Sequence, residues 1–156
     1  MNVGPQPGES PKQRADRELG ELLTEFRVVL PGITVLFGFL LAVPFASRWS
    51  DVDSFQHDVF LTAFLATGAS IAFLVALSSY HRLRFRAADK EQLVRVGNVL
   101  GIVGITCFGI ALDAVVLLVT DFVTGSDFAA GATAGMAALV LLLWYGLPVW
   151  DRLRTR

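Results

Sequence analysis

Charged residues along this chain gather in short clusters, and four stretches between the clusters are almost purely apolar. The stretches cover residues 28–47, 59–80, 96–120 and 128–150, so each has about 20 to 25 residues. A helix needs about 20 apolar residues to cross a hydrocarbon core of about 30 Å, and membrane β-strands are about half as long. Lipid also requires each segment to satisfy its own backbone hydrogen bonds. The pattern therefore predicts four transmembrane helices.

The polar sequence before the first apolar stretch divides into two parts. Residues 1–12 are rich in Pro and Gly, a composition that cannot bury a core, so we expect a disordered tail. Residues 13–27 place four apolar side chains on one helical stripe: Leu19, Leu22, Leu23 and Phe26. This spacing predicts a short amphipathic helix that lies on the cytoplasmic membrane surface ahead of the first span.

We therefore expect an all-α fold, a polytopic membrane four-helix bundle preceded by the short amphipathic helix. Residues 13–156 form a single domain, with spans at about 28–47, 58–81, 93–120 and 128–150. Two Asp-x-x-Gln sequences, which begin at Asp53 and Asp89, resemble capping boxes. They predict that the second and third helices begin near Ser54 and Lys90, several residues before their apolar runs.

The positive charges are distributed very unevenly between the two sides of this predicted bundle. Twelve of the thirteen Lys and Arg residues lie in the N-terminal segment, the second loop or the C-terminal tail, and only Arg48 lies in an outer loop. By the positive-inside rule, this bias predicts a multi-pass protein of the cytoplasmic (inner) membrane with both termini in the cytoplasm.

Composition narrows the function classes further. The net charge is −1, so nothing indicates a nucleic-acid partner. The single cysteine, Cys107, has no second cysteine for an intrachain disulfide and no nearby metal ligands. We find no nucleophile–base pair and no cluster of metal ligands, so we expect no cofactor, no metal site, no catalytic residue and no enzymatic activity.

Asp113 is the only charged residue inside an apolar run. An acid within a membrane costs about 2.5 kcal/mol or more at the centre, so it is a functional-site hypothesis by default. At about 100° per residue, five polar residues of the third helix form one stripe along it. These residues are Arg95, Asn98, Thr106, Asp113 and Thr120. Asp113 is either the titrating group of a proton or cation path, or a structural residue that bonds a neighbouring hydroxyl, His57 or Arg48.

Small residues mark the surfaces on which these helices are expected to pack, because they let membrane helices approach closely. Three of them, Gly97, Gly101 and Gly104, lie opposite the polar stripe, and Gly131 and Gly135 lie on the fourth helix. Because both faces of the third helix are specialised, we expect it to pack on both sides. It is then either the central helix, or its glycine face forms a dimer contact.

A basic cluster follows the second apolar stretch and is a candidate for binding anionic lipid headgroups. Its residues are His81, Arg82, Arg84 and Arg86. The alternative interpretation is an ordinary anchor that obeys the positive-inside rule.

Two segments carry a resemblance to a known family. Residues 17–32 read RELGELLTEFRVVLPG and residues 80–86 read YHRLRFR. Together they resemble an uncharacterised family of small four-helix bacterial membrane proteins, classed as a domain of unknown function, over about residues 16–125. Some relatives carry an automatic sodium:proton antiporter label. The resemblance implies the four-helix architecture and assigns no catalytic residue.

Two function hypotheses follow from these observations. The first is a structural or accessory membrane protein whose partners are the lipid bilayer and a homodimer mate or larger membrane complex. The second is a proton-linked cation transporter that works as a homodimer, with Asp113 as the titrating group. The first is favoured at this point, because a coupled transporter usually carries several intramembrane ionisable groups and this chain shows one.

The predicted orientation can be tested by thiol labelling of intact cells. A cysteine that replaces Asp53 should react with a membrane-impermeant maleimide, because the first loop is expected outside. A cysteine that replaces Ala88 should not react until the cells are opened. Both variants need a background in which Cys107 is replaced by serine. Labelling at position 88 and none at position 53 in intact cells would overturn the orientation.

Overall fold

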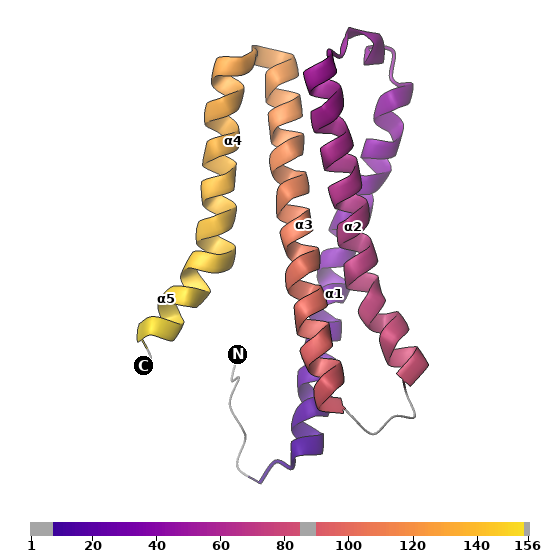
Figure 1. Cartoon of the computed structure of the whole chain (residues 1–156), viewed down its shortest axis with the longest axis vertical. Helices are drawn as coiled ribbons and strands as arrows, with labels where there is room; N and C mark the ends of the chain where they lie inside the picture. Colours follow the sequence, from indigo (N-terminus) through magenta and orange to yellow (C-terminus); the bar gives the residue numbers. More distant parts are fainter. Residues whose placement is uncertain (1–7, 85–89, 155–156) are drawn as a thin grey trace.

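The computed structural model describes residues 8–84 and 90–154, and helices account for nearly all of these ranges. Its elements are α1 (Pro11–Ala42), η1 (Val43–Phe45), η2 (Trp49–Asp51), α2 (Ser54–Arg84), α3 (Lys90–Thr124), α4 (Ser126–Leu141), η3 (Leu142–Gly146) and α5 (Leu147–Arg154). The long helices run up and down beside one another (Figure 1). Four helical stretches are long and apolar enough to span a membrane: Asp16–Phe45, Ser54–Ala76, Gln92–Thr124 and Asp127–Asp151. The expected all-α fold with four membrane-length helices is confirmed.

Helix α1 begins earlier than the hydrophobic pattern indicates, because Ser10 caps it. The Ser10 hydroxyl accepts a hydrogen bond from the Gln13 backbone N–H at 3.3 Å. The Gln13 side chain in turn accepts from the Ser10 backbone N–H at 2.9 Å. Pro11 fills the first helical position, where its missing N–H costs nothing. The helix thus starts inside the segment expected to be a disordered tail, 1–12.

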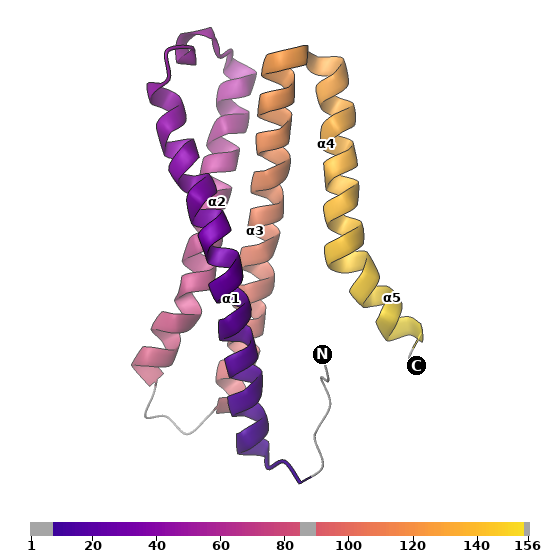
Figure 2. The same cartoon turned by 180° about the vertical axis from the view of Figure 1, so that it is seen from behind.

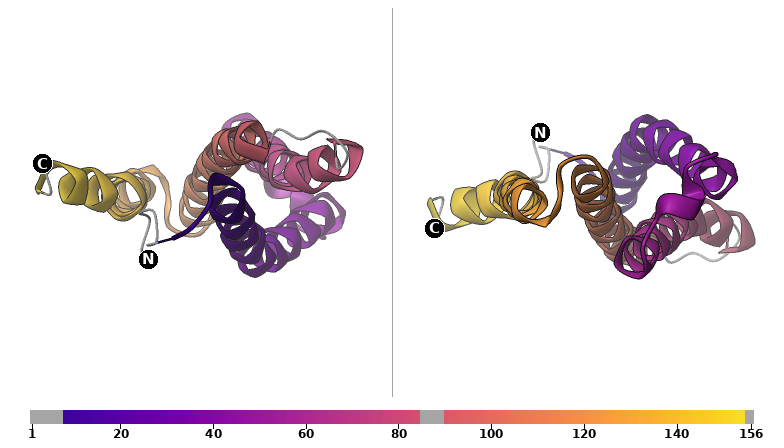
Figure 3. Two further views of the ribbon diagram at one scale, coloured as in Figure 1. Left: turned by 90° about the horizontal axis from the view of Figure 1, so that it is seen from below. Right: turned by 90° about the horizontal axis from the view of Figure 1, so that it is seen from above.

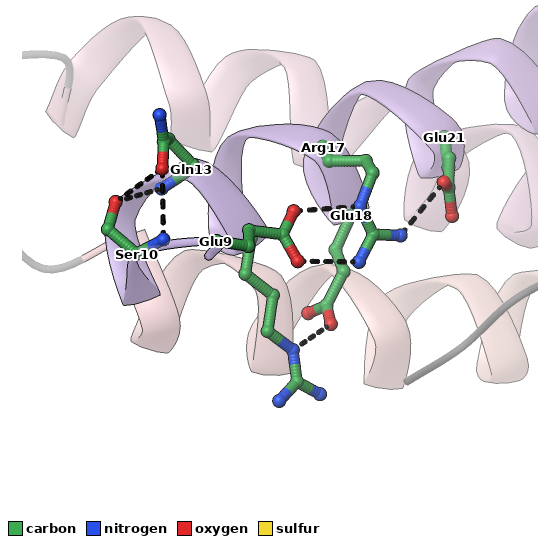
Figure 4. Close-up of polar contacts among 7 residues, drawn as sticks. Glu9, Ser10, Gln13, Arg17, Glu18 and Glu21 are labelled. Atoms are coloured by element: carbon green, nitrogen blue, oxygen red, sulfur yellow. Dashed lines mark hydrogen bonds and ion pairs between the residues drawn. The ribbon is translucent and has the colours of Figure 1, made fainter. Parts of the chain in front are cut away.

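Ion pairs support the first turns of α1 (Figure 4). Arg17 binds Glu9 at 3.0 Å and Glu21 at 3.2 Å, so it links the residue before the helix to its third turn. Arg14 pairs with Glu18 at 2.7 Å. Pairs four residues apart contribute only about 0.2–0.5 kcal/mol each. They reinforce the start of α1 without determining it.

The amphipathic segment 13–27 and the first span form one continuous helix. Helix α1 runs unbroken through Pro31. The apolar stripe is therefore part of the same helix as the first span. Leu19 and Phe26 are buried with Leu93 of α3 in one cluster of the core. Because α3 extends beyond its apolar run, it supplies a partner surface for the stripe.

The predicted starts of α2 and α3 are confirmed. Helix α2 begins at Ser54 and helix α3 at Lys90. At α2 the capping box is present: the Gln56 N–H donates to Asp53 Oδ1 at 2.8 Å, and the Asp53 N–H donates to Gln56 Oε1 at 3.4 Å. The corresponding Asp89 lies outside the described residues.

One polar contact ties the start of α2 to the end of α3. The Gln56 side chain is buried, and its Nε2 donates to the Asp121 carboxylate at 2.9 Å. Close by, Trp49 lies edge-on to Phe60 with ring centroids 4.9 Å apart. These contacts close the end of the bundle at which the α1–α2 loop and Gly125 lie.

Helix α3 occupies the centre of the arrangement. It contacts α1, α2 and α4, whereas α4 contacts no other long helix in the described part of the chain. Along the helix axes, α1, α2 and α3 form a three-helix group, and α4 lies outside it against α3 (Figure 3). A Cβ added at Gly104 would lie 2.8 Å from Leu74 Cγ, and one at Gly101 would lie 2.8 Å from Phe26 Cζ. Of the two alternatives for α3, the structure thus has the central helix, with its glycine face packed within the same chain.

A single residue, Gly125, joins α3 to α4. Its φ of 90° is a conformation that residues with a Cβ rarely adopt. Its N–H donates to the Asp121 carbonyl at 3.0 Å, and its carbonyl accepts from the Ala129 N–H at 3.3 Å. The same residue therefore ends one helix and starts the next. The result is a tight antiparallel hairpin of α3 and α4.

The last span is helical over the expected residues, 128–150, and contains one irregular segment. Helix α4 ends at Leu141, the segment η3 is π-helical, and α5 follows. After η3 the chain turns away from α3 (Figure 2). Helix α5 contacts η3 and no other element in the described ranges.

Substitution of Gly104 by alanine tests the close packing of α3. The new Cβ would meet the buried Leu74 side chain at 2.8 Å, so we expect a loss of about 1–3 kcal/mol in the free energy of unfolding. The matched control is Gly131→Ala on α4, where nothing lies within 4 Å and alanine should be neutral or stabilising. Unfolding in mixed detergent–SDS micelles measures both. Equal effects of the two substitutions would contradict the packing.

Candidate functional site

A cavity of about 140 Å³ lies between α3 and the α4–η3 segment, and we call it the Asp113 cavity. Its polar lining comes from Thr106 and Asp113 of α3 and Tyr145 of η3. The remaining lining is apolar: Gly109, Ile110, Ala137, Val140, Leu141 and Trp144. The cavity is the place where the polar stripe predicted for the third helix faces another helix.

Asp113 carries a buried oxygen that has no partner. Its Oδ1 is inaccessible to solvent and makes no hydrogen bond within the described part of the chain. A buried polar atom without a partner costs about 1–3 kcal/mol, and more when it is charged. Such an atom in a native fold calls for an explanation, of which an absent ion or a functional role are the usual kinds.

The structural partners proposed for Asp113 are engaged elsewhere. Arg48 pairs with Asp51 at 3.3 Å and its guanidinium lies over the Phe122 ring, 4.5 Å from the centroid. His57 stacks against Trp49, with ring centroids 5.5 Å apart. Both therefore belong to the end of the bundle at which Gln56 contacts Asp121. The interpretation of Asp113 as a residue that binds one of them finds no support in the geometry.

A short hydrogen bond joins the two helices at the other end of the cavity. The hydroxyl oxygens of Thr106 and Tyr145 are 2.6 Å apart. The Thr106 hydroxyl also donates to the Ile102 carbonyl at 2.7 Å, and it has only one proton to give. The Tyr145 hydroxyl is therefore the donor to Thr106. This contact holds η3 against α3.

The Trp144 ring forms one wall of the site. It stacks on Phe108 with ring centroids 6.2 Å apart. Gly109 permits this approach, because a Cβ there would lie 3.4 Å from the Trp144 ring and 3.2 Å from Val140. Gly109 thus serves the α4 side of α3, opposite the face that contacts α1 and α2.

The π-helical segment explains how two consecutive aromatic residues both reach α3. Neighbouring residues of an α-helix point about 100° apart, and the wider π turn of Leu142–Gly146 changes that spacing locally. Trp144 and Tyr145 both line the cavity as a result. π-bulges are rare and occur frequently at functional sites.

The rest of the polar stripe does not enter the cavity. Arg95 and Asn98 are exposed on the part of α3 that α5 leaves uncovered. The Thr120 hydroxyl donates a hydrogen bond to the Val116 carbonyl of its own helix at 2.6 Å. Of the five stripe residues, the structure therefore brings only two, Thr106 and Asp113, into one site.

The remaining candidate residues fall outside this site. Gly97 is buried on the glycine face of α3, next to the close contacts at Gly101 and Gly104. Gly131 and Gly135 have open space where a Cβ would stand. In the basic cluster, the side chains of His81, Arg82 and Arg84 and the whole of Arg86 lie outside the described residues.

Trp144 and Tyr145 were missed as site residues, although the sequence carries a signal for them. A hairpin with Gly125 at its turn places residues across from each other when their numbers sum to about 250. Thr106 then faces the Trp144–Tyr145 pair, and Asp113 faces the region of Ala137.

Replacement of Asp113 by leucine distinguishes a functional acid from a structural one. Because Oδ1 has no partner, Asp113→Leu should raise the free energy of unfolding, by about 1 kcal/mol or more. A structural acid would give a loss instead. The exposed Asp127 provides the charge-matched control: Asp127→Leu should give no gain, and a loss of at most about 1 kcal/mol because Asp127 lies in the first turn of α4. Unfolding in mixed micelles is the measurement, and destabilisation by Asp113→Leu would contradict the prediction.

Comparison with known proteins gives one match. A family model described as "Family of unknown function (DUF6328)" matches residues 8–148, which include the whole of the Asp113 cavity. Comparisons with curated proteins and with solved structures gave no match. The match confirms the resemblance to an uncharacterised family and extends it across α4. The chain therefore belongs to DUF6328, a family of unknown function.

Proposed function

We propose that this chain is a multi-pass protein of the cytoplasmic membrane with both termini in the cytoplasm. The charge bias supports this orientation, because described basic residues from different helices fall at the same end of the bundle. Arg14, Arg95 and Arg154 lie near the start of α1, the start of α3 and the end of α5, and all three ends lie towards the bottom of Figure 1. Arg48 lies at the opposite end.

Within the membrane, we propose proton-linked cation transport, with Asp113 as the group that binds both ions in turn. One observation carries this proposal: the buried Asp113 Oδ1 has no hydrogen-bond partner among the described residues and lies beside a cavity. A carboxylate that serves the fold would be expected to bond the groups around it. A carboxylate that serves an exchanged ion has to keep a free acceptor.

The coupling needs only one carboxylate. A cation displaces the proton from Asp113 when it binds, and a proton displaces the cation when it returns, so the two ions compete for one site. The arrangement of α4 suits this exchange, because α4 packs on α3 alone among the long helices described. A shift of α4 would open the cavity and leave the three-helix group intact.

The competing hypothesis is a structural or accessory protein without transport or enzymatic activity. It was favoured by the single intramembrane acid, and it explains Asp113 as a satisfied structural residue. The engagement of Arg48 and His57 elsewhere removes two of the partners that this explanation named. The third, a neighbouring hydroxyl, makes no hydrogen bond to the buried Oδ1 among the described residues. The accessory hypothesis is therefore the outcome expected if the transport test fails.

Proteoliposomes with an acidic interior test the transport proposal. Addition of a cation salt outside should make the interior more alkaline faster than in protein-free liposomes, as protons leave in exchange. Sodium, potassium and tetramethylammonium serve as probes, because none of them crosses lipid as a neutral base. Asp113→Asn should abolish this exchange, since the neutral amide retains the shape and binds neither a proton nor a cation.

The control for this assay is Asp127→Asn, which removes the same charge from an exposed position and should retain the exchange. Exchange by wild-type protein that persists in Asp113→Asn would place the path elsewhere. If no probe is exchanged by the wild-type protein, the transport proposal fails and the accessory hypothesis replaces it.

A further inference from the structure

We propose that the ligand of the Asp113 cavity is a small organic ammonium cation rather than a metal ion. The inference rests on the proposed function in giving Asp113 the role of cation ligand. It adds the chemical class of the cation. Four features of the cavity lead to it: its few oxygen ligands, its aromatic wall, its size and its open side.

The oxygen ligands around Asp113 are too few for a bare metal ion. Hard cations such as Ca²⁺ and Mg²⁺ require about six or more oxygen ligands. The polar residues among those that line the cavity are Asp113, Thr106 and Tyr145, and their polar atoms expose almost no surface to it. The hydroxyls lie two helical turns away from Asp113, about 10 Å along the axis. No group of three His, Cys, Asp or Glu side chains able to hold a metal occurs in the described ranges.

An ammonium group needs fewer oxygen ligands than a metal ion does, and the cavity supplies the groups that it needs. One carboxylate neutralises its charge, and an aromatic face attracts its positive surface through the ring quadrupole. Trp144, the best type of ring for this interaction, lines the same cavity as Asp113. The remaining walls are aliphatic, as in Val140 and Ile110, and they suit methyl or methylene groups on the nitrogen.

The size of the cavity limits the ligand. A cavity of about 150 Å³ holds a molecule of the size of benzene. The Asp113 cavity has about 140 Å³, so it accepts an ammonium head with a few carbon atoms. A bulky lipophilic cation with several aromatic rings would exceed this volume.

The open side of the cavity indicates how the ligand enters. Ile110 and Leu141 at its rim are 49% and 61% exposed. In a bilayer these apolar side chains face hydrocarbon, so the natural approach is from the lipid, by a cation with an apolar body. A larger cavity of about 220 Å³ lies at the outer end, but its charged residue, Arg48, is already paired with Asp51. That cavity offers no comparable free acceptor.

The experiment measures binding of radiolabelled choline to the whole protein in nanodiscs. Choline serves as the probe because its charge is permanent and its volume matches the cavity. Its uncharged carbon isostere, 3,3-dimethyl-1-butanol, is the matched competitor and should displace choline at least tenfold less well than unlabelled choline. Sodium chloride, matched in ionic strength with a large-cation salt, should not compete.

Two variants assign the binding to the cavity. Asp113→Asn should weaken choline binding at least tenfold, and Trp144→Leu should weaken it several-fold, whereas Asp127→Asn should bind like the wild type. Trp144→Leu leaves the acid in place, so the proposal stays testable if Asp113→Asn fails to fold. Equal displacement by the isostere, or unchanged binding in Trp144→Leu, would overturn the inference.

The outcomes also separate this inference from the transport proposal. Choline binding that depends on Asp113, without exchange in liposomes, would retain the ligand class and reject transport. Exchange of sodium that depends on Asp113, without choline binding, would retain transport and reject the organic cation.

Discussion

The close approach of α3 to its neighbours is the interaction on which the rest of the structure depends. In lipid there is little gain from burying apolar surface, so helices associate where their backbones come near one another. Gly101 and Gly104 provide this proximity on one side of α3, against Phe26 and Leu74. Gly109 provides it on the other side, against Val140 and Trp144. With glycines on both faces, α3 packs on two sides, and its remaining surface, which includes Val99, Ile102 and Val119, is exposed.

This central position determines what happens to the polar stripe of α3. A helix at the edge of a bundle would turn an acid towards its neighbours, and its apolar face would contact lipid. In α3 the neighbours α1 and α2 already occupy the glycine face, so Asp113 is directed at α4. Helix α4 and the segment η3 place aliphatic and aromatic side chains and one hydroxyl opposite Asp113. That hydroxyl, of Tyr145, bonds Thr106 rather than the acid. The unpartnered Asp113 oxygen is thus a consequence of the packing order.

Much of the fold was predictable because its signals are local and strong. The lengths of the apolar runs indicated four spans, and the Asp53 and Gln56 side chains marked the start of α2 where the structure has it. The start of α1 was equally predictable in principle, since Ser10, Pro11 and Gln13 form a capping box with proline at the first helical position. The proline and glycine content of residues 1–12 favoured a disordered tail instead.

Other features followed from contacts between distant segments. Whether the stripe of Leu19 and Phe26 lies on a membrane or inside the bundle depends on how far α3 extends beyond its apolar run. Amphipathic spacing is the same in both cases. The surroundings of Asp113 likewise depended on where Arg48 and His57 would lie. Arg48 pairs with Asp51, and His57 stacks against Trp49.

By itself, the sequence determined that this protein is a set of four membrane-length helices with one acid among them, because helix length and charge placement are local properties. The tertiary structure decided which helix is central, which face each glycine serves and what stands across from Asp113. Those choices depend on a hairpin turned at Gly125 and on a π segment that directs Trp144 and Tyr145 onto α3. The physical reason is that the backbone geometry at the turns determines which residues of two helices face each other. The periodicity of apolar residues within one helix carries no information about that pairing.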